Sequence, residues 1–265
     1  MRIVRILVGL LAPVAVGVGS VSAQETGFLN RVVAIDRVEY RYQVYVPHEF
    51  QRSSSLPIIL ALHGGGEYGR DGLLQTDGGL AHAIRQHPDR FPAIVVFPQS
   101  PPGGTPGFQE LGERIALSAL DNSIAEFDAD ASRVYLTGLS MGGNGAWYLA
   151  YHHAERFAAV IVVCGFIGVF TGTTSGVHYP AIVTMANGDP YAAIAQRVSS
   201  LPIWIFHGDA DPTVPVEVSR RMAAALKTIG ADVQYNELPG VGHNAWDPAY
   251  GRADLFTWLF MQKRR

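Results

Sequence analysis

The sequence predicts an α/β fold, a mostly parallel sheet covered on both faces by helices, and two patterns carry this prediction. Short and nearly continuous apolar runs recur along the chain, and most are followed by a stretch whose apolar residues have helical spacing. Continuous apolar runs are typical of parallel strands buried on both faces, and alternation of strands with helices is typical of a doubly wound sheet. The 265 residues, 48% of them hydrophobic, suffice for one sizeable core.

The predicted elements follow one another in a regular order. Residues 31–46 alternate between apolar and polar side chains and favour an antiparallel hairpin at the sheet edge. The strands expected after it are 58–62, 93–97, 134–137, 159–163, 203–206 and 233–238. The helices expected between and after them are 80–85, 113–127, 144–151, 216–229 and 252–262. Residues 166–200 are the least regular, and we expect a loop with one short helix there rather than a large cap domain.

The first 23 residues are expected to be a signal peptide preceding a single domain of residues 24–265. Arg2 and Arg5 come before an uncharged apolar run, and Val-Ser-Ala at 21–23 is a small-x-small cleavage site. The alternative is an uncleaved membrane anchor, but the run is shorter than the roughly 18 apolar residues of a bilayer span and contains Pro13. We therefore expect a secreted or periplasmic protein with no stable membrane association after cleavage.

Charge and cysteine content exclude several other classes. The formal net charge is −3 and there is no basic run, so nucleic acid is a poor partner. Cys164 is the single cysteine, which rules out an internal disulfide; it is interpreted as a buried small hydrophobe, with a catalytic thiol as the alternative. No group of Cys, His and acidic residues has metal-ligand spacing, so we expect no metal and no cofactor. The sequence does not specify an oligomeric state.

The strongest chemical motif is Gly138-Leu139-Ser140-Met141-Gly142, which directly follows one predicted strand and precedes a helix. In this context a serine sits on a sharp turn, and its Oγ projects above the sheet. Gly138 and Gly142 permit the turn because a Cβ at either position would clash. The helix N-terminus directs backbone N–H groups at a developing oxyanion. Ser140 is the candidate nucleophile; a glycine-rich turn that contains a serine by chance is the alternative.

A second glycine-rich segment follows the strand at 58–62. His63 is followed by Gly64, Gly65 and Gly66, and glycines are needed where the backbone itself must approach a substrate oxygen. We expect this segment and Met141 to supply the backbone donors of an oxyanion hole, each worth about 3 kcal/mol of barrier. Which glycine donates is left open, and a flexible strand-end loop is the alternative.

The acid and the base are expected at the ends of the last two strands. Asp211 fits the spacing His-Gly-x-x-Asp-x-x-Val-Pro after the strand at 203–206, whereas Asp209 is expected to cap the turn. Of nine histidines, only His243 follows both the serine and the acid, as the order Ser, Asp, His requires. A structural loop histidine is the alternative for His243.

Together these motifs resemble the α/β-hydrolase superfamily, and more narrowly its bacterial secreted esterases and predicted peptidases. That group includes proteins similar to dienelactone hydrolases, feruloyl esterases and polyhydroxybutyrate depolymerases. The stretches that carry the resemblance are 62–72, 95–101, 136–144, 207–215 and 242–246. The resemblance implies the α/β-hydrolase fold, a catalytic triad of Ser140, Asp211 and His243, and no cofactor. One departure is the absence of any possible disulfide, which sets the chain apart from fungal-type feruloyl esterases.

The resulting expectation is a serine hydrolase that forms an acyl-enzyme on a small or polymer-derived ester. Residues adjacent in sequence to the triad and oxyanion groups are candidates for contacting the substrate, and these are Glu67, Tyr68, Gln99, Asn144 and Trp246. A peptidase or an acyltransferase would use the same triad, and a non-catalytic binding protein would usually have lost one member of it.

Overall fold

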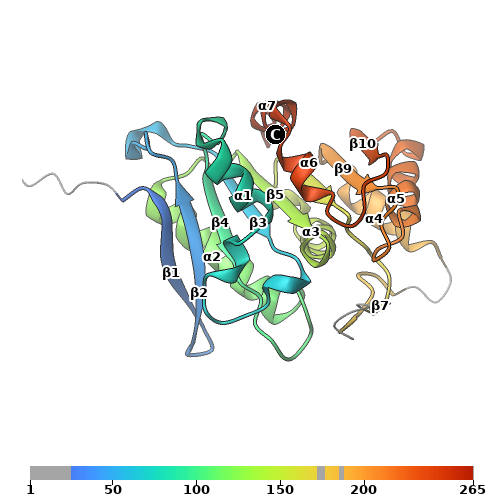
Figure 1. Cartoon of the computed structure of the whole chain (residues 1–265), viewed down its shortest axis with the longest axis horizontal. Helices are drawn as coiled ribbons and strands as arrows, with labels where there is room; N and C mark the ends of the chain where they lie inside the picture. The colour runs from blue at the N-terminus through green and yellow to red at the C-terminus, as the bar shows by residue number, and fades with distance from the viewer. Residues whose placement is uncertain (1–24, 172–176, 185–187, 265) are drawn as a thin grey trace, which may run out of the picture.

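The computed structural model describes residues 25–171, 177–184 and 188–264, and its centre is an eight-stranded sheet (Figure 1). The strand order is β1-β2-β4-β3-β5-β6-β9-β10. The strands are β1 Gly27–Ile35, β2 Val38–Val46, β3 Ile58–Leu62, β4 Ile94–Pro98, β5 Val134–Leu139, β6 Ala159–Val163, β9 Ile203–Gly208 and β10 Val233–Leu238. The expected signal peptide at 1–23 lies outside the described residues.

The pairing of the strands confirms the predicted fold class. β1 and β2 form an antiparallel hairpin, β2 is antiparallel to β4, and every other neighbouring pair in this sheet is parallel. Every residue of β3, β4 and β6 is buried, as expected of strands covered on both faces. All six residues of β10 are half-buried because this strand forms the edge of the sheet.

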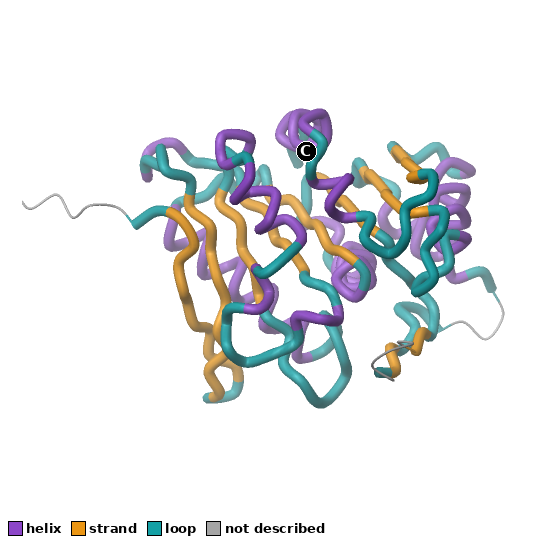
Figure 2. The backbone as a smooth tube through the Cα atoms, viewed as in Figure 1, coloured by secondary structure: helices purple, strands orange, loops and turns teal. Residues whose placement is uncertain are grey.

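Helices cover both faces of the sheet (Figure 2). Two separate clusters of buried apolar side chains lie between the helices and the sheet. On one face lie α2 Leu111–Phe127, α3 Met141–His152, α4 Pro190–Val198 and α5 Glu217–Thr228. On the other lie α1 Gly79–Gln86, α6 Trp246–Tyr250 and α7 Ala253–Met261. Single 3-10 turns occupy η1 Arg52–Ser54, η2 Gly65–Glu67, η3 Leu74–Thr76, η4 Pro88–Arg90 and η5 Ala154–Arg156.

The described residues of the irregular stretch at 166–200 contain more secondary structure than the sequence predicted. It contains α4, the one short helix expected, and also a two-stranded antiparallel hairpin of β7 Phe170–Thr171 and β8 His178–Tyr179. The short helix α6 was likewise not predicted. Within the described part of the chain, no helix combines the length and apolar character that crossing a bilayer requires.

The topology gathers the predicted motifs at one end of the sheet. Leu62 at the end of β3 lies opposite Gly138 near the end of β5, and Gly208 at the end of β9 lies opposite Leu238 at the end of β10. The segments that follow these strands carry the glycine-rich loop, Ser140, the acid and the last histidine. Carboxyl ends of parallel strands share one edge of a sheet, which is where such folds bind their ligands.

Candidate active site

Ser140 occupies a strained position between β5 and α3. Its backbone has φ 52° and ψ −115°, a conformation that costs a non-glycine residue free energy and is found at functional sites. The Ser140 N–H donates to the Val163 carbonyl at 2.9 Å. A Cβ on Gly138 would lie 2.0 Å from the Gly142 oxygen, and one on Gly142 would lie 2.1 Å from the Leu62 oxygen. The turn therefore requires glycine on both sides of the serine.

A chain of hydrogen bonds connects Ser140 to the acid and base suggested by the sequence. His243 Nε2 lies 2.9 Å from Ser140 Oγ, and His243 Nδ1 lies 2.7 Å from Asp211 Oδ2. Asp209 is not part of this series of hydrogen bonds, because its exposed carboxylate accepts from the Gly240 N–H at 2.7 Å. The structure thus brings Ser140, His243 and Asp211 together in hydrogen-bonding geometry.

The Asp211 carboxylate is fully enclosed and fully hydrogen-bonded. Its side chain is 0% exposed. Oδ1 accepts from the N–H groups of Thr213 and Val214 at 2.8 and 3.0 Å, while Oδ2 faces both His243 and His207. Burial alone would raise the pKa of this carboxyl, but the hydrogen bonds from the two imidazoles and the two amides hold it well below its usual range. Asp211 is therefore ionised at neutral pH.

His207 is a member of this network that sequence reasoning passed over. It is completely buried, and its Nε2 lies 3.1 Å from Asp211 Oδ2 and 3.0 Å from the Val214 carbonyl oxygen. Because both neighbours of Nε2 are acceptors, this nitrogen carries the proton. Nδ1, 2.7 Å from Ser219 Oγ, then accepts from that hydroxyl. The i,i+4 spacing of His207 and Asp211 across a turn was the available signal.

A cleft of about 480 Å³ opens at Ser140 and His243. The cleft is lined by Met141 and by Gly64, Gly65 and Gly66, which are the residues predicted to form the oxyanion hole. Glu67 and Trp246 also line it, and Trp246 packs edge-on against the His243 ring at 5.5 Å. An aromatic wall that the sequence analysis did not anticipate completes the cleft, formed by Phe166, Phe170 and Tyr179.

Three of the expected substrate contacts are not among the residues that line this cleft. Gln99 is 2% exposed and holds the loop after β3, because its Oε1 accepts from the Gly72 N–H at 2.8 Å. Asn144 is 1% exposed and donates to the Phe166 carbonyl at 2.9 Å. Tyr68 packs edge-on against the buried His63. Buried amides need hydrogen-bond partners, and here the neighbouring loops supply them.

The glycine-rich loop is itself anchored by His63. This imidazole is fully buried, and burial lowers its pKa to about 4, so it is neutral. Nε2 accepts from the Ser100 N–H at 2.9 Å, which leaves Nδ1 as the protonated nitrogen that donates to the Gly64 carbonyl at 2.7 Å. Burial also raises the pKa of Glu67, which follows the three glycines.

One group with metal-ligand geometry occurs among the described residues, and spacing in the sequence did not reveal it. Ligand atoms of Cys164, Asp211 and His243 lie within 4.8 Å of one another. Burial raises the pKa of the Cys164 thiol, which donates to the His243 carbonyl at 3.5 Å. Metals bind the thiolate, and both Asp211 oxygens already accept hydrogen bonds. The residues present therefore fit an acid–imidazole pair better than a metal centre.

Comparison with known sequences identifies the family. The profile of the prolyl oligopeptidase family matches residues 116–262, more than half of the chain. The chain belongs to this family. The match covers the strands and loops that carry Ser140, Asp211 and His243, and the fold described above is the α/β-hydrolase fold.

Individual relatives are similar at modest identity. The chain is 27% identical to acetylxylan esterase A of Emericella nidulans over 252 residues, covering 77% of this chain and 80% of that one. An uncharacterized secreted protein of Arthroderma benhamiae is 24% identical over 216 residues, covering 72% of this chain. The structure of a thermostable esterase superposes with a TM-score of 0.74 at 30% identity over 89% of this chain. The chain spans only 22% of the secreted protein and 63% of the thermostable esterase.

Proposed function

We propose that this chain is a serine carboxylic-ester hydrolase with Ser140 as nucleophile, His243 as general base and acid, and Asp211 as the orienting carboxylate. The observation that carries the proposal is the pair of hydrogen bonds joining Ser140 Oγ to His243 Nε2 and His243 Nδ1 to Asp211 Oδ2. This is the arrangement in which an otherwise weakly nucleophilic hydroxyl is activated by an adjacent base.

The proposed reaction has two halves. His243 Nε2 takes the Ser140 proton as Oγ attacks the ester carbonyl, and it returns that proton to the leaving alcohol as the acyl-enzyme forms. A water molecule then gives its proton to the same nitrogen, attacks the acyl carbon, and the proton passes back to Ser140 as the acid leaves. Asp211 fixes the Nδ1–H tautomer of His243 and stabilises the imidazolium in both halves.

Backbone N–H groups are proposed to hold the tetrahedral oxyanion. Met141 begins α3 directly after Ser140, and the three glycines at 64–66 line the same cleft. A helix N-terminus directs unpaired N–H groups outward. Removing one such donor typically costs about 3–4 kcal/mol of transition-state stabilisation, which makes this the largest contribution after the triad.

The proposed substrates are small or polymer-derived esters. A cleft of about 480 Å³ is in the range of pockets that accept small-molecule ligands. Similarity to an acetylxylan esterase over most of both chains favours an ester. The family match favours a second candidate, a peptidase acting through the same three residues, and an acyltransferase would differ only in the acceptor of the acyl group.

Labelling with a fluorophosphonate tests the nucleophile. The intact mass should increase by one phosphonyl group in the wild-type chain and in Ser200→Ala, which changes an exposed serine, but not in Ser140→Ala. A modified Ser140→Ala chain would refute the assignment. Rates on matched acetyl esters and acetyl amides then separate an esterase from a peptidase, and product analysis with added alcohol identifies acyl transfer.

We also propose that the protein is exported and that residues 1–23 are removed. The sequence features of this segment and the similarity to a secreted protein support the proposal. N-terminal sequencing of the protein recovered outside the cytoplasm should begin at Gln24, whereas a chain that retains Met1 would contradict it.

A further inference from the structure

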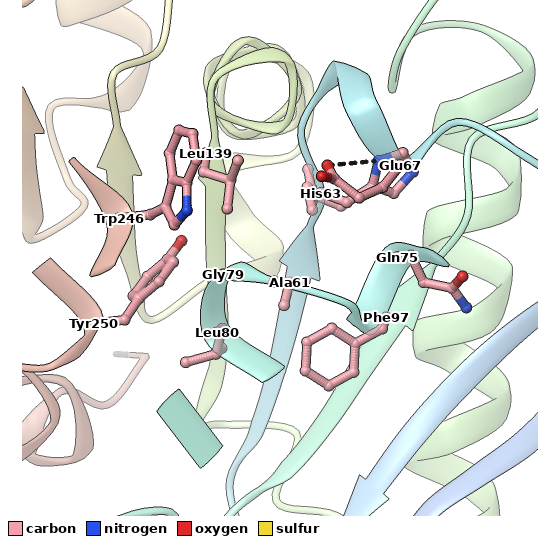
Figure 3. A pocket seen from close by; sticks show the side chains of 12 residues that line it. Ala61, His63, Glu67, Gln75, Gly79, Leu80, Phe97, Leu139, Trp246 and Tyr250 are labelled. Carbon is pink, nitrogen blue, oxygen red and sulfur yellow. Dashed lines mark ion pairs between the residues drawn. The ribbon is translucent and has the colours of Figure 1, made fainter. Parts of the chain in front are cut away.

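A second, smaller pocket adjoins the catalytic cleft on the side of α1 and α6 (Figure 3). Three residues line both spaces, namely Glu67, Leu139 and Trp246. Figure 3 shows Leu139, Trp246 and Tyr250 on one side of the pocket and Phe97 on the other. The volume of the pocket, about 40 Å³, is room for about three groups of the size of a water molecule.

Apolar side chains form most of the wall of this pocket. They come from β3, β4, β5 and α1, and they are Ala61, Phe97, Leu139 and Leu80. All four are buried. Each methylene group that a ligand buries against such a wall leaves water and strengthens binding about fourfold.

The polar side chains around the pocket leave it little polar character. Both ring nitrogens of His63 are hydrogen-bonded to backbone groups, and the Tyr250 hydroxyl is 2.9 Å from Thr137 Oγ1. Figure 3 shows the Gln75 amide turned away from the pocket. Burial raises the pKa of Glu67, the one acidic side chain of the lining. A wall of this kind favours a ligand group that is uncharged and consists mainly of carbon.

Leu139 connects the pocket to the catalytic centre, because it directly precedes Ser140 and lines both spaces. A Cβ on Gly64 would lie 2.8 Å from Leu139 Cδ1 and 3.9 Å from Ser140 Cβ. A Cβ on Gly79 would lie 2.6 Å from Leu139 Cδ2. The Leu139 side chain therefore reaches from the glycine-rich loop beside the nucleophile to the start of α1.

The position of Leu139 determines which part of an ester is nearest to the pocket. In the proposed acyl-enzyme the acyl carbon is bonded to Ser140 Oγ, and its oxygen is held by the backbone donors of the oxyanion hole. A chain carried by this carbon begins within a few bond lengths of Leu139. The leaving alcohol must lie beside His243 Nε2, which protonates it, and the wider cleft of about 480 Å³ is open to the rest of that alcohol.

We propose that this pocket is an acyl subsite for a short, unbranched and uncharged chain, and that Ala61 and Leu80 set the length of the chain. The proposal rests on the proposed ester hydrolysis and adds the class of acyl group. About three carbon atoms beyond the carbonyl carbon fill the space, so butanoyl is the longest group that fits. The alcohol has no such limit, and an ester of a short acid with a bulky alcohol is a suitable substrate.

Two series of esters test the subsite. The acyl group grows from nitrophenyl acetate through propanoate and butanoate to hexanoate and octanoate, and kcat/KM should rise up to about fourfold per carbon as far as butanoate. It should fall roughly tenfold or more at hexanoate, because a longer chain must displace the wall or leave the pocket. The alcohol grows from ethyl through butyl to hexyl acetate, and no such fall is expected in this series.

Variants that change the size of the pocket should move the limit. Ala61→Val adds two methyl groups to the wall, so the ratio of kcat/KM for butanoate to that for acetate should fall roughly tenfold. Leu80→Ala removes part of the wall at α1, and hexanoate should become as good a substrate as butanoate. Ala34→Val makes the first change at an exposed position of β1 and should leave the ratio unaltered. Leu80→Val provides a smaller enlargement should the alanine variant fail to fold.

An acyl series without a fall between butanoate and hexanoate, or a limit that neither the Ala61 nor the Leu80 variants move, would overturn the acyl subsite. A fall confined to the alcohol series would also overturn it, because the alcohol would then occupy the pocket. Failure of the proposed function is recognised separately, because it would abolish fluorophosphonate labelling of Ser140 and hydrolysis of every ester in both series.

Discussion

The two sides of Ser140 differ in how completely their polar groups are hydrogen-bonded. On the acid side, both oxygens of Asp211 and both ring nitrogens of His207 have partners within the protein. On the side of the glycine-rich loop, three buried atoms of Glu67 and Gln75 have none in the described structure. The two carboxyls reflect this contrast, since the pKa of Asp211 is lowered and that of Glu67 is raised.

The contrast indicates that the two sides of Ser140 have different roles. The acid side is organised before a substrate arrives, so no reorganisation is needed when charge develops on His243. On the side of the glycine-rich loop, the described structure shows no comparable network around Glu67 and Gln75. Catalysis should therefore depend most on the acid side.

The largest expected effect comes from Asp211→Asn. The amide cannot hold the Nδ1–H tautomer of His243 as the carboxylate does, and kcat on a simple acetyl ester should fall about 10⁴-fold. Asp209→Asn is the matched control, because the Asp209 carboxylate is exposed and accepts from the Gly240 N–H in the turn. The activity of this variant should stay close to wild type. Equal losses in the two variants would contradict the assigned roles.

His207 provides the next test. His207→Leu removes one of the donors that fix the position of the Asp211 carboxylate against His243, a hydrogen bond to a charged group worth about 1.5–3 kcal/mol. Because a misplaced carboxylate no longer orients the imidazole, kcat should fall roughly 10–100-fold. A carboxylate with one donor fewer holds the protonated His243 more strongly, so the acidic limb of the kcat/KM profile should move to higher pH. A merely structural role for His207 would lower the folded fraction without moving this limb.

His207→Gln is the rescue variant, because its amide N–H can replace the Nε2 donor. Relative to His207→Leu, this variant should recover most of the lost kcat, and the acidic limb of its kcat/KM profile should return to the wild-type pH. A glutamine variant as impaired as the leucine variant would show that the imidazole does more than donate to Asp211.

Two stability measurements sharpen the comparison further. Ser219→Ala leaves Nδ1 of the buried His207 without its partner and should lower the free energy of unfolding by about 1–3 kcal/mol. Gln75→Leu breaks no hydrogen bond in the described structure, so the free energy of unfolding should be unchanged or higher. Urea titrations of both variants check this, and a loss in Gln75→Leu as large as that in Ser219→Ala would remove the distinction.

The smallest expected effect concerns Glu67 and pH. Burial raises the folded-state pKa of Glu67 above the ordinary value of 4.5, so the native state binds this proton more tightly. The contribution of Glu67 to stability therefore decreases as the pH rises above about 4.5. Glu67→Gln should therefore be more stable than wild type at pH 7, by less than about 1 kcal/mol for this partly exposed side chain. The difference should vanish near pH 4, as thermal unfolding at the two pH values would show.

Asp211 should behave in the opposite sense. Its folded-state pKa lies below the ordinary 3.8, so it contributes stability above that pH, and the contribution is lost as the pH falls further. If ionisation of both carboxyls changed the stability in the same direction, the contrast between the two sides would be contradicted.

The sequence predicted the sheet and the catalytic candidates because their signals are local. Strands buried on both faces have continuous apolar runs, and β3 and β6 begin and end where the sequence placed them. The candidate triad follows β5, β9 and β10. The hairpin with Phe170 and Tyr179 was missed because its two-residue strands are too short to show a period.

The direction of a side chain was not predictable in the same way. Gln99 and Asn144 are adjacent in sequence to the groups at the cleft, but each side chain turns toward loop backbone that only the fold brings near. Gln75 gave no signal at all, because its burial depends on the path of the chain between β3 and α1.

The tightly packed glycines around Ser140 limit how this protein can change over time. A side chain at position 138 or 142 would clash with neighbouring backbone atoms. A random library selected for folding should therefore contain no substitutions at either position. Neither residue needs to touch a substrate for this to hold. New specificities must therefore arise at the cleft walls, such as Phe170 and Trp246, while the turn that carries the nucleophile stays as it is.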